Sequence, residues 1–161
     1  MGNMTVQDLR VRDIARAAVA TMSPDDLVDF DELVDAYADD PKAALRAGRA
    51  RAEPTASASA VTMHALTVVA IAVACDLSSD LVKAGARQGW RTARPRLARI
   101  FPWRKRSTNP RLTDAIAPEL LLDQVPEART RAVETARRMG VPEETAVAVA
   151  SEVINAWVAP R

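Results

Sequence analysis

An uncharged stretch between segments of opposite charge constrains the fold of this chain more than any other feature. Residues 54–75 contain no Asp, Glu, Lys or Arg. Residues 1–40 hold about ten acids and three arginines, residues 41–112 hold about fourteen basic residues and three acids, and the remainder is mildly acidic again. Because Ala and Val dominate the uncharged stretch, we expect a helix that is either buried in a core or embedded in a membrane.

The remaining sequence also favours helices. Glycines are few, prolines stand where helices would begin, and no segment has the pattern of a strand. At 161 residues the chain is long enough to bury a core. We therefore expect an all-α protein, a multi-helix bundle of about six to eight helices with an Ala/Val-rich central helix and a C-terminal helical hairpin.

The charge pattern divides the chain into three predicted regions. Residues 1–53 form an acidic N-terminal helical region, residues 54–106 an apolar central helix plus a basic segment, and residues 107–161 a C-terminal helical hairpin region. The boundary near residue 107 is placed in the polar sequence WRKRSTNP, which is typical of an exposed linker.

Three helices are predicted in the N-terminal region. The first covers Thr5–Met22 and begins with Thr5 and Asp8 as a capping box. The second begins at Ser23-Pro24-Asp25-Asp26, and its aspartates are expected to face solvent. A third helix begins at Asp40-Pro41 and continues to about Ala52. The buried stripe of the second helix is predicted to be Leu27, Phe30, Leu33, Val34 and Tyr37.

Further helices are predicted in the rest of the chain. The uncharged helix covers 56–77, residues 76–80 end it and cap a new helix, and a basic helix covers 81–93. One or two short helices are expected over 112–125, with Pro118 opening the second. The final pair runs from Pro126 to Met139, with Gly140 as the C-terminal cap, and from Pro142 to Val158.

The uncharged helix has two interpretations. A membrane-spanning helix needs about twenty mostly apolar residues, and this stretch is just long enough. Ser and Thr residues and His64 lower the hydrophobicity of its first half. Its strongly apolar part, Leu66–Cys75, is only about ten residues long. We therefore favour a central core helix. The alternative is a single-pass or pore-forming membrane helix over about 58–75, packed through small residues.

The basic segment predicts an anionic partner. Trp90, Phe101 and Trp103 lie between its charges. Such a segment suits anionic lipid headgroups, nucleic acid phosphates or an acidic protein surface, which includes the chain's own residues 25–40. Nucleic acid is the less favoured partner. The predicted anionic-partner residues are Lys83, Arg87, Arg91, Arg94, Arg99, Arg104, Lys105 and Arg106.

The C-terminal helix pair predicts a packing or oligomerisation surface. Residues 136–145 resemble a helix-turn-helix element, with Gly140 in the turn. The second helix opens with Glu143 and Glu144, which would repel phosphates where a DNA-reading helix contacts bases. It is otherwise apolar almost all round, as in a helix that is buried or buries a partner. The predicted interface residues are Val149, Val153, Ile154 and Trp157.

The sequence contains no recognisable catalytic or cofactor motif. It has no glycine-rich phosphate loop, no nucleophile elbow and no paired-histidine metal motif. The single cysteine, Cys75, is expected to be a buried thiol, and the single histidine excludes a paired-His site. We therefore expect no catalytic residues, no metal, no cofactor and no small-molecule substrate.

These features predict a non-catalytic bacterial helical interaction or scaffold protein. It would self-associate as a homo-oligomer or bind a protein partner through its apolar helices. Its basic segment would meet an anionic membrane or an acidic partner. No secretory signal is evident at the N-terminus, so we expect a cytoplasmic protein. It would lie either free in the cytoplasm or at the inner face of the membrane. The alternatives are the membrane protein described above and a nucleic-acid-binding regulator that uses residues 83–106.

Overall fold

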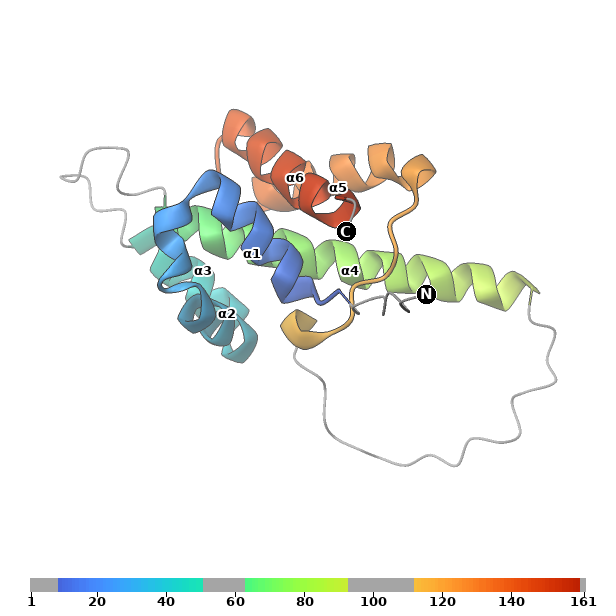
Figure 1. The fold of residues 1–161 in the computed structure, drawn as a ribbon, viewed down its shortest axis with the longest axis horizontal. Coiled ribbons are helices and arrows are strands. Elements are labelled where there is room, and N and C mark those ends of the chain that lie inside the picture. Colours follow the sequence, from blue (N-terminus) through green and yellow to red (C-terminus); the bar gives the residue numbers. More distant parts are fainter. Residues whose placement is uncertain (1–8, 51–62, 93–111, 160–161) are drawn as a thin grey trace, which may run out of the picture.

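The computed structural model describes residues 9–50, 63–92 and 112–159, with side chains over 9–47, 65–85 and 112–159. This part of the chain is helical, as predicted (Figure 1). The α-helices are α1 (Val11–Met22), α2 (Phe30–Asp39), α3 (Pro41–Ala50), α4 (Met63–Thr92), α5 (Val125–Arg138) and α6 (Glu143–Val158). Three short 3₁₀ helices are η1 (Pro24–Leu27), η2 (Leu112–Asp114) and η3 (Leu122–Gln124).

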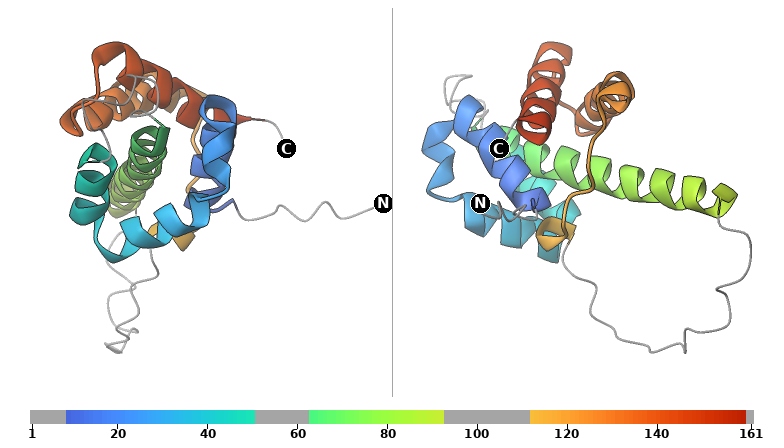
Figure 2. Two further views of the ribbon diagram at one scale, coloured as in Figure 1. Left: turned by 90° about the vertical axis from the view of Figure 1, so that its left-hand side faces the viewer. Right: turned by 45° about the vertical axis from the view of Figure 1, so that its right-hand side comes forward.

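Helix α4 lies at the centre, and the other helices surround its first half (Figure 2). It contacts α1, α2, α3, α5 and α6. Every side chain from Val68 to Cys75 is 3% exposed or less. A helix that is apolar all round is stable in water only when neighbours cover it on every side. The prediction of an Ala/Val-rich central helix is confirmed for these residues, and the core draws on all three predicted regions.

Helix α1 begins later than predicted. Leu9 and Arg10 are extended and lie beside Ile116, where the Val11 N–H donates to the Ala115 carbonyl at 3.0 Å. The Asp13 carboxylate accepts the Arg10 N–H at 3.1 Å and stabilises the first turn. The predicted start at Thr5 is therefore wrong, because Leu9 and Arg10 pair with the connector that precedes α5. The expected Thr5–Asp8 cap lies outside the described residues.

The second predicted helix is divided into η1 and α2. Its buried stripe is confirmed, since Phe30 and Val34 are buried and Leu27, Leu33 and Tyr37 pack against the core. One aspartate does not face solvent. Asp26 is 3% exposed, and its carboxyl oxygen accepts a hydrogen bond of 2.7 Å from the Thr67 hydroxyl of α4. Burying this polar group is tolerated because it is hydrogen-bonded.

The start of α3 matches the prediction. Asp40 precedes Pro41, and its carboxylate accepts the backbone N–H groups of Lys42 and Ala43 at 3.0 Å. These two bonds satisfy donors that the first turn of a helix leaves without partners. The helix is described as far as Ala50, and its predicted end near Ala52 lies outside the described residues.

Helix α4 is continuous through residues 76–80, where the sequence predicted a stop and a new start. That prediction is wrong because Asp76 and Asp80 do not cap a helix end. They lie one turn apart and contact Arg138 and Arg131 of α5. The sequence suggested that the Asp and Ser residues at 76–80 cap a helix end. The two carboxylates instead interact with arginines of another helix, α5. The start predicted at Ala56 lies outside the described residues.

The C-terminal hairpin is as predicted, but the connector before it is not helical at Pro118. Residues 115–121 are extended or irregular between η2 and η3. Helix α5 ends at Arg138, and Gly140 has a φ of 80°, a left-handed conformation that glycine adopts without strain. The predicted boundary near residue 107 lies outside the described residues.

Trp157 anchors the connector to α6. It is 6% exposed, and its Nε1–H donates to the Pro118 carbonyl at 2.9 Å. The indole therefore fills the core with its ring and satisfies a backbone oxygen of the connector with its polar edge.

We predict that Trp157→Ala lowers the free energy of unfolding by roughly 3–5 kcal/mol, because it leaves a cavity and an unpaired carbonyl. Trp157→Phe should lower it by about 1–3 kcal/mol, because most of the ring is kept and the donor is lost. Urea denaturation measures both. Wild-type stability of Trp157→Phe would contradict the hydrogen-bonding role, and equal stability of the two variants would contradict burial of the ring.

We predict that Thr67→Val destabilises the fold by roughly 1–3 kcal/mol, because it removes a buried hydroxyl donor without changing side-chain volume much. Thr67→Ser keeps the hydroxyl and should be closer to wild type. Thr21→Val, at an exposed position of α1, is the control. If Thr67→Val unfolds at the same urea concentration as the control, the Asp26–Thr67 bond contributes nothing to stability.

Candidate interaction site at the α4–α5 junction

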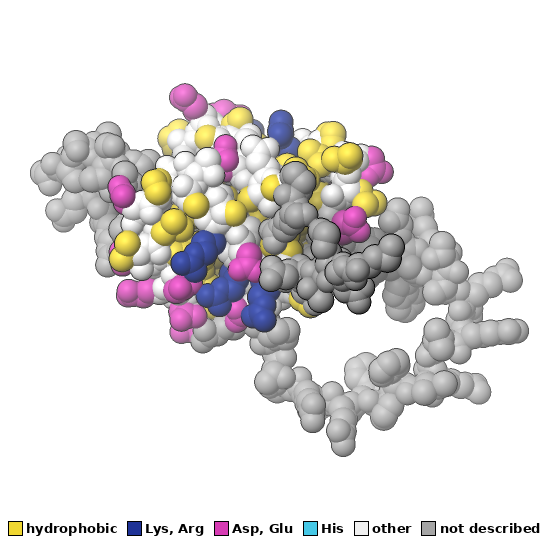
Figure 3. All heavy atoms as spheres, viewed as in Figure 1, with side chains coloured by type: hydrophobic (Ala, Val, Ile, Leu, Met, Phe, Trp, Pro, Cys, Tyr) yellow, Lys and Arg dark blue, Asp and Glu magenta, His cyan; other side chains and the backbone are white. Residues whose placement is uncertain are grey.

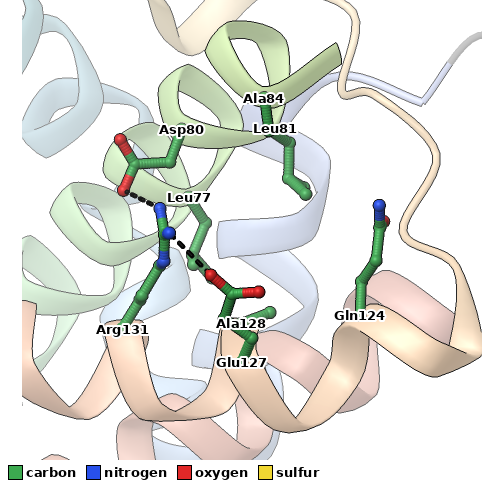
Figure 4. A pocket seen from close by; sticks show the side chains of 8 residues that line it. All are labelled: Leu77, Asp80, Leu81, Ala84, Gln124, Glu127, Ala128 and Arg131. Carbon is green, nitrogen blue, oxygen red and sulfur yellow. Dashed lines mark hydrogen bonds and ion pairs between the residues drawn. The ribbon is translucent and has the colours of Figure 1, made fainter. Parts of the chain in front are cut away.

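A small apolar notch opens between α4 and the beginning of α5 (Figure 4). It has a volume of about 60 Å³. Leu77 and Ala128 are buried at its floor, Leu81 is half-buried, and Ala84 is exposed at its open end. We call this feature the α4–α5 notch; its lining residues are Leu77, Asp80, Leu81, Ala84, Gln124, Glu127, Ala128 and Arg131.

Helical spacing brings these residues together. Leu77, Leu81 and Ala84 follow one another at intervals of four and three residues, so they share one face of α4. The facing side of α5 is buried through small residues, among them Ala128 and Ala132. Small side chains let the two helices approach closely, and the larger leucines then reach across the gap.

A charged group forms the rim of the notch. Arg131 donates to Asp80 Oδ2 at 3.2 Å and to Glu127 Oε1 at 2.6 Å. Hydrogen bonding to Glu127 and then to Asp80 raises the pKa of Arg131, so this side chain stays charged. Lys83 Nζ lies 3.8 Å from the other oxygen of Asp80, Oδ1. Because these groups are exposed, the pairs orient the two helices more than they stabilise them.

A second polar group continues the seam between the same two helices. The Thr135 hydroxyl donates to Asp76 Oδ2 at 3.1 Å, and Arg138 lies 3.4 Å from the same oxygen. Arg138 also donates to the Thr135 hydroxyl oxygen at 2.8 Å. The α4–α5 contact is thus apolar inside and charged along its edge, with Asp76 and Asp80 on successive turns.

Past the notch, α4 extends away from the bundle (Figure 1). Val82 through Gly85 are exposed, and a Cβ atom placed on Gly85 would meet nothing within 4 Å. The connector residues Leu121 and Leu122, which come just before Gln124, are 48% and 83% exposed. Figure 3 shows hydrophobic side chains gathered at this end of the molecule, over the start of α5.

The predicted anionic-partner residues are described only in part. Lys83 lies beside the notch, exposed and near Asp80. Arg87 and Arg91 belong to the α4 backbone, but their side chains are not described. Arg94, Arg99, Arg104, Lys105 and Arg106 lie outside the described residues.

The four predicted interface residues of α6 are buried within the chain itself. Val149 and Val153 are 0% exposed, Ile154 is 1% exposed, and Trp157 is nearly as enclosed. They belong to the core that α1, α4 and α5 share with α6. Contact of these residues with a second molecule stays a prediction; the exposed apolar residues of α6 are Val147 and Val158.

A wider and more open groove lies on the outer surface between α5 and α6. It has a volume of about 540 Å³ and is lined by Val125, Arg129, Val133 and Val147, among others. Arg137 at its edge pairs with Glu143. Because its lining mixes both charges with scattered valines, no single ligand chemistry is favoured there.

Sequence reasoning missed the notch because of the stop predicted at residues 76–80. The spacing of Leu77, Leu81 and Ala84 could have indicated the notch. These three residues lie on one face only if α4 is a single helix through residues 76–80. The partners Glu127 and Arg131 are at i and i+4 on α5, a common helical ion-pair spacing that does not indicate which helix lies opposite.

The described residues show neither a metal-binding cluster nor an activated thiol. Within residues 9–50, 63–92 and 112–159 no group of three or more His, Cys, Asp and Glu side chains could hold a metal ion. Burial, and then the negative charge of Asp76, raises the pKa of the Cys75 thiol to about 12. Burial likewise raises the pKa of Tyr37. A thiol with so high a pKa is a poor nucleophile at neutral pH.

Part of α4 is long and apolar enough to cross a membrane by length and composition alone. That part is Ala65–Gly85, with a mean hydropathy of 1.8, and 61% of the window is buried inside the chain. A core helix of a soluble protein passes the same test, and here α4 is covered by five other helices.

Comparison of this chain with protein-family models, curated proteins and solved structures found no match.

We predict that Cys75 resists thiol reagents in the folded protein and reacts at once in denaturant. The cause is its burial and raised pKa, since the thiolate is the reacting form. Absorbance of a disulfide-exchange reagent at pH 8, with and without urea, measures this. Rapid labelling of the folded protein at pH 8 would contradict a buried structural thiol.

Proposed function

We propose that the protein is a non-catalytic helical interaction module, which binds a protein partner at the α4–α5 notch. One observation carries this proposal. The apolar stripe of α4 is covered by α5 at Leu77 and reaches the open end of the notch at the exposed Ala84, and α4 itself stays helical to Thr92. A stripe of this kind suits the apolar face of a partner helix, which is a common mode of recognition.

The chemistry of the rim supports a protein partner over a small molecule. The notch is too small for a drug-sized ligand, since such pockets have volumes of about 300–1,000 Å³. It can hold one or two apolar side chains, with the Asp80–Arg131–Glu127 group as a polar rim. An apolar centre within a polar rim is typical of protein interfaces.

The second part of the proposal is that the basic segment, residues 83–106, binds an anionic surface. The segment follows the notch directly, and its charges would favour an acidic surface on the partner or an anionic membrane. We place the protein in the cytoplasm, where either surface is reachable. A scaffold role follows if the notch and the basic segment engage different molecules.

The membrane-spanning alternative is less well supported. Moving a span over about 58–75 into a bilayer would strip α1, α5 and α6 of the core that they share with α4. A span shifted to 65–85 would in addition carry Asp76 and Asp80 into hydrocarbon, at a free-energy cost of about 2.5–3.5 kcal/mol for an aspartate near the centre of a membrane.

Site-specific photo-crosslinking in cells tests the proposal. A photoreactive amino acid is placed at Ala84, at the open end of the notch, and in a control at Ala20, which is exposed on α1. We expect a discrete adduct from position 84 and none from position 20, because only the notch binds a partner. Equal adducts from both positions, or none from position 84, would contradict the proposal.

A further inference from the structure

The geometry points to a second copy of this chain as the partner at the notch, through antiparallel pairing of the two α4 helices about Gly85. This inference rests on the proposed function and specifies its partner. In the pair, the outer part of α4 from each copy lies along the open end of the other copy's notch.

The stripe on α4 has the spacing of a helix-pairing seam. Intervals of four, three, four and three residues separate Leu77, Leu81, Ala84, Gln88 and Arg91. These intervals are those of a helix-pairing seam, in which Leu77, Leu81 and Ala84 are the apolar positions and Gln88 and Arg91 extend the seam as polar ones. In the described chain α5 covers the first part of the stripe, while Ala84 is exposed and α4 continues helical to Thr92. The outer part of the seam thus extends past its intramolecular partner.

The charges along the seam are complementary under a twofold axis near Gly85. Asp80 stands five residues before Gly85 and Arg91 six residues after it, on the same side of the helix. In an antiparallel pair, Arg91 of each copy therefore falls level with the partner's Asp80. A twofold contact makes every such pair twice.

Asp80 has an oxygen available for this contact. Its Oδ2 atom accepts the hydrogen bond from Arg131, while its Oδ1 atom has only Lys83 Nζ near it, at 3.8 Å, among the described residues. That distance exceeds hydrogen-bond range. Oδ1 can therefore accept a guanidinium from the partner without displacing Arg131.

The helix surface at the centre of the pair permits close approach. Ala84 and Gly85 present almost no side chain, and space is open around Gly85. Glycine inside a helix costs about 1 kcal/mol relative to alanine, and no contact among the described residues offsets that cost at Gly85. Close packing against the partner's backbone would offset it. Leu121 and Leu122, which come shortly before the notch residue Gln124 in the chain, are also exposed.

Sedimentation velocity on the purified full chain, in buffer without detergent, tests this inference. We expect a concentration-dependent dimer that weakens as salt rises, because opposite charges help to form it. Gly85→Leu should raise the dimer dissociation constant about tenfold or more, because a bulky side chain blocks the approach of the helices. The Gly85→Leu monomer should melt no lower than wild type, since the position is open and leucine favours helix more than glycine. Ala20→Leu is the matched control and should leave the dimer unchanged.

A charge reversal gives the second arm. Arg91→Glu should weaken the dimer about tenfold, because it places a carboxylate level with the partner's Asp80. Arg129→Glu makes the same change at an exposed position of α5 and should have no effect. A wild-type chain that stays monomeric at high concentration, or a dimer that neither Gly85→Leu nor Arg91→Glu weakens, would overturn the inference.

The crosslinking experiment separates this inference from the proposed function. A position-84 adduct of twice the chain's mass supports both. An adduct with a different protein, together with a monomeric purified chain, overturns the self-pairing and leaves the proposed function standing. No adduct and no dimer overturn both.

Discussion

The fold depends on covering one helix that has no polar face. The side chains of α4 from Val68 to Cys75 are all buried, and α1, α2, α3, α5 and α6 all contact α4. Burial of apolar surface is worth about 25 cal/mol per Å², so a helix of this composition is driven to the centre. Each surrounding helix packs against the core with an apolar face, so its charged residues can stay on the solvent-facing side. Asp26 enters the core with a hydrogen-bond partner, whereas the buried Thr113 hydroxyl has none among the described residues.

Much of this arrangement was predictable from periodicity and helix-boundary residues. The stripe of α2, the cap at Asp40 and the turn at Gly140 follow local rules that the sequence displays directly. The features that were mispredicted depend on residues far apart in the chain. Leu9 and Arg10 are extended because they pair with the connector around Ile116, and α4 continues through Asp76 and Asp80 because α5 supplies arginines opposite them. The residues near each of these positions in the sequence do not indicate which distant residues will contact them.

The candidate site illustrates the same limit. The basic character of the segment after residue 83 is visible in the sequence, whereas the notch exists only once α4 is continuous and α5 lies beside it. The apolar residues of α6 were expected at an interface because apolar helices either fill a core or bind a partner. Val149 and Val153 are enclosed within the chain, and the exposed large hydrophobic residues lie elsewhere, Val82, Leu121 and Leu122 among them. The distinction between core and surface required knowing which helices pack together.

The central claim is that α4 is a core helix whose outer part extends past the bundle. Hydrogen–deuterium exchange on the dilute, detergent-free protein tests it most directly. The account predicts the slowest backbone exchange at Val68–Leu77 and much faster exchange from Gly85 to Thr92, because only the first stretch is enclosed by other helices. Slower exchange in α1 or α6 than in the middle of α4, or uniform protection along α4, would contradict it.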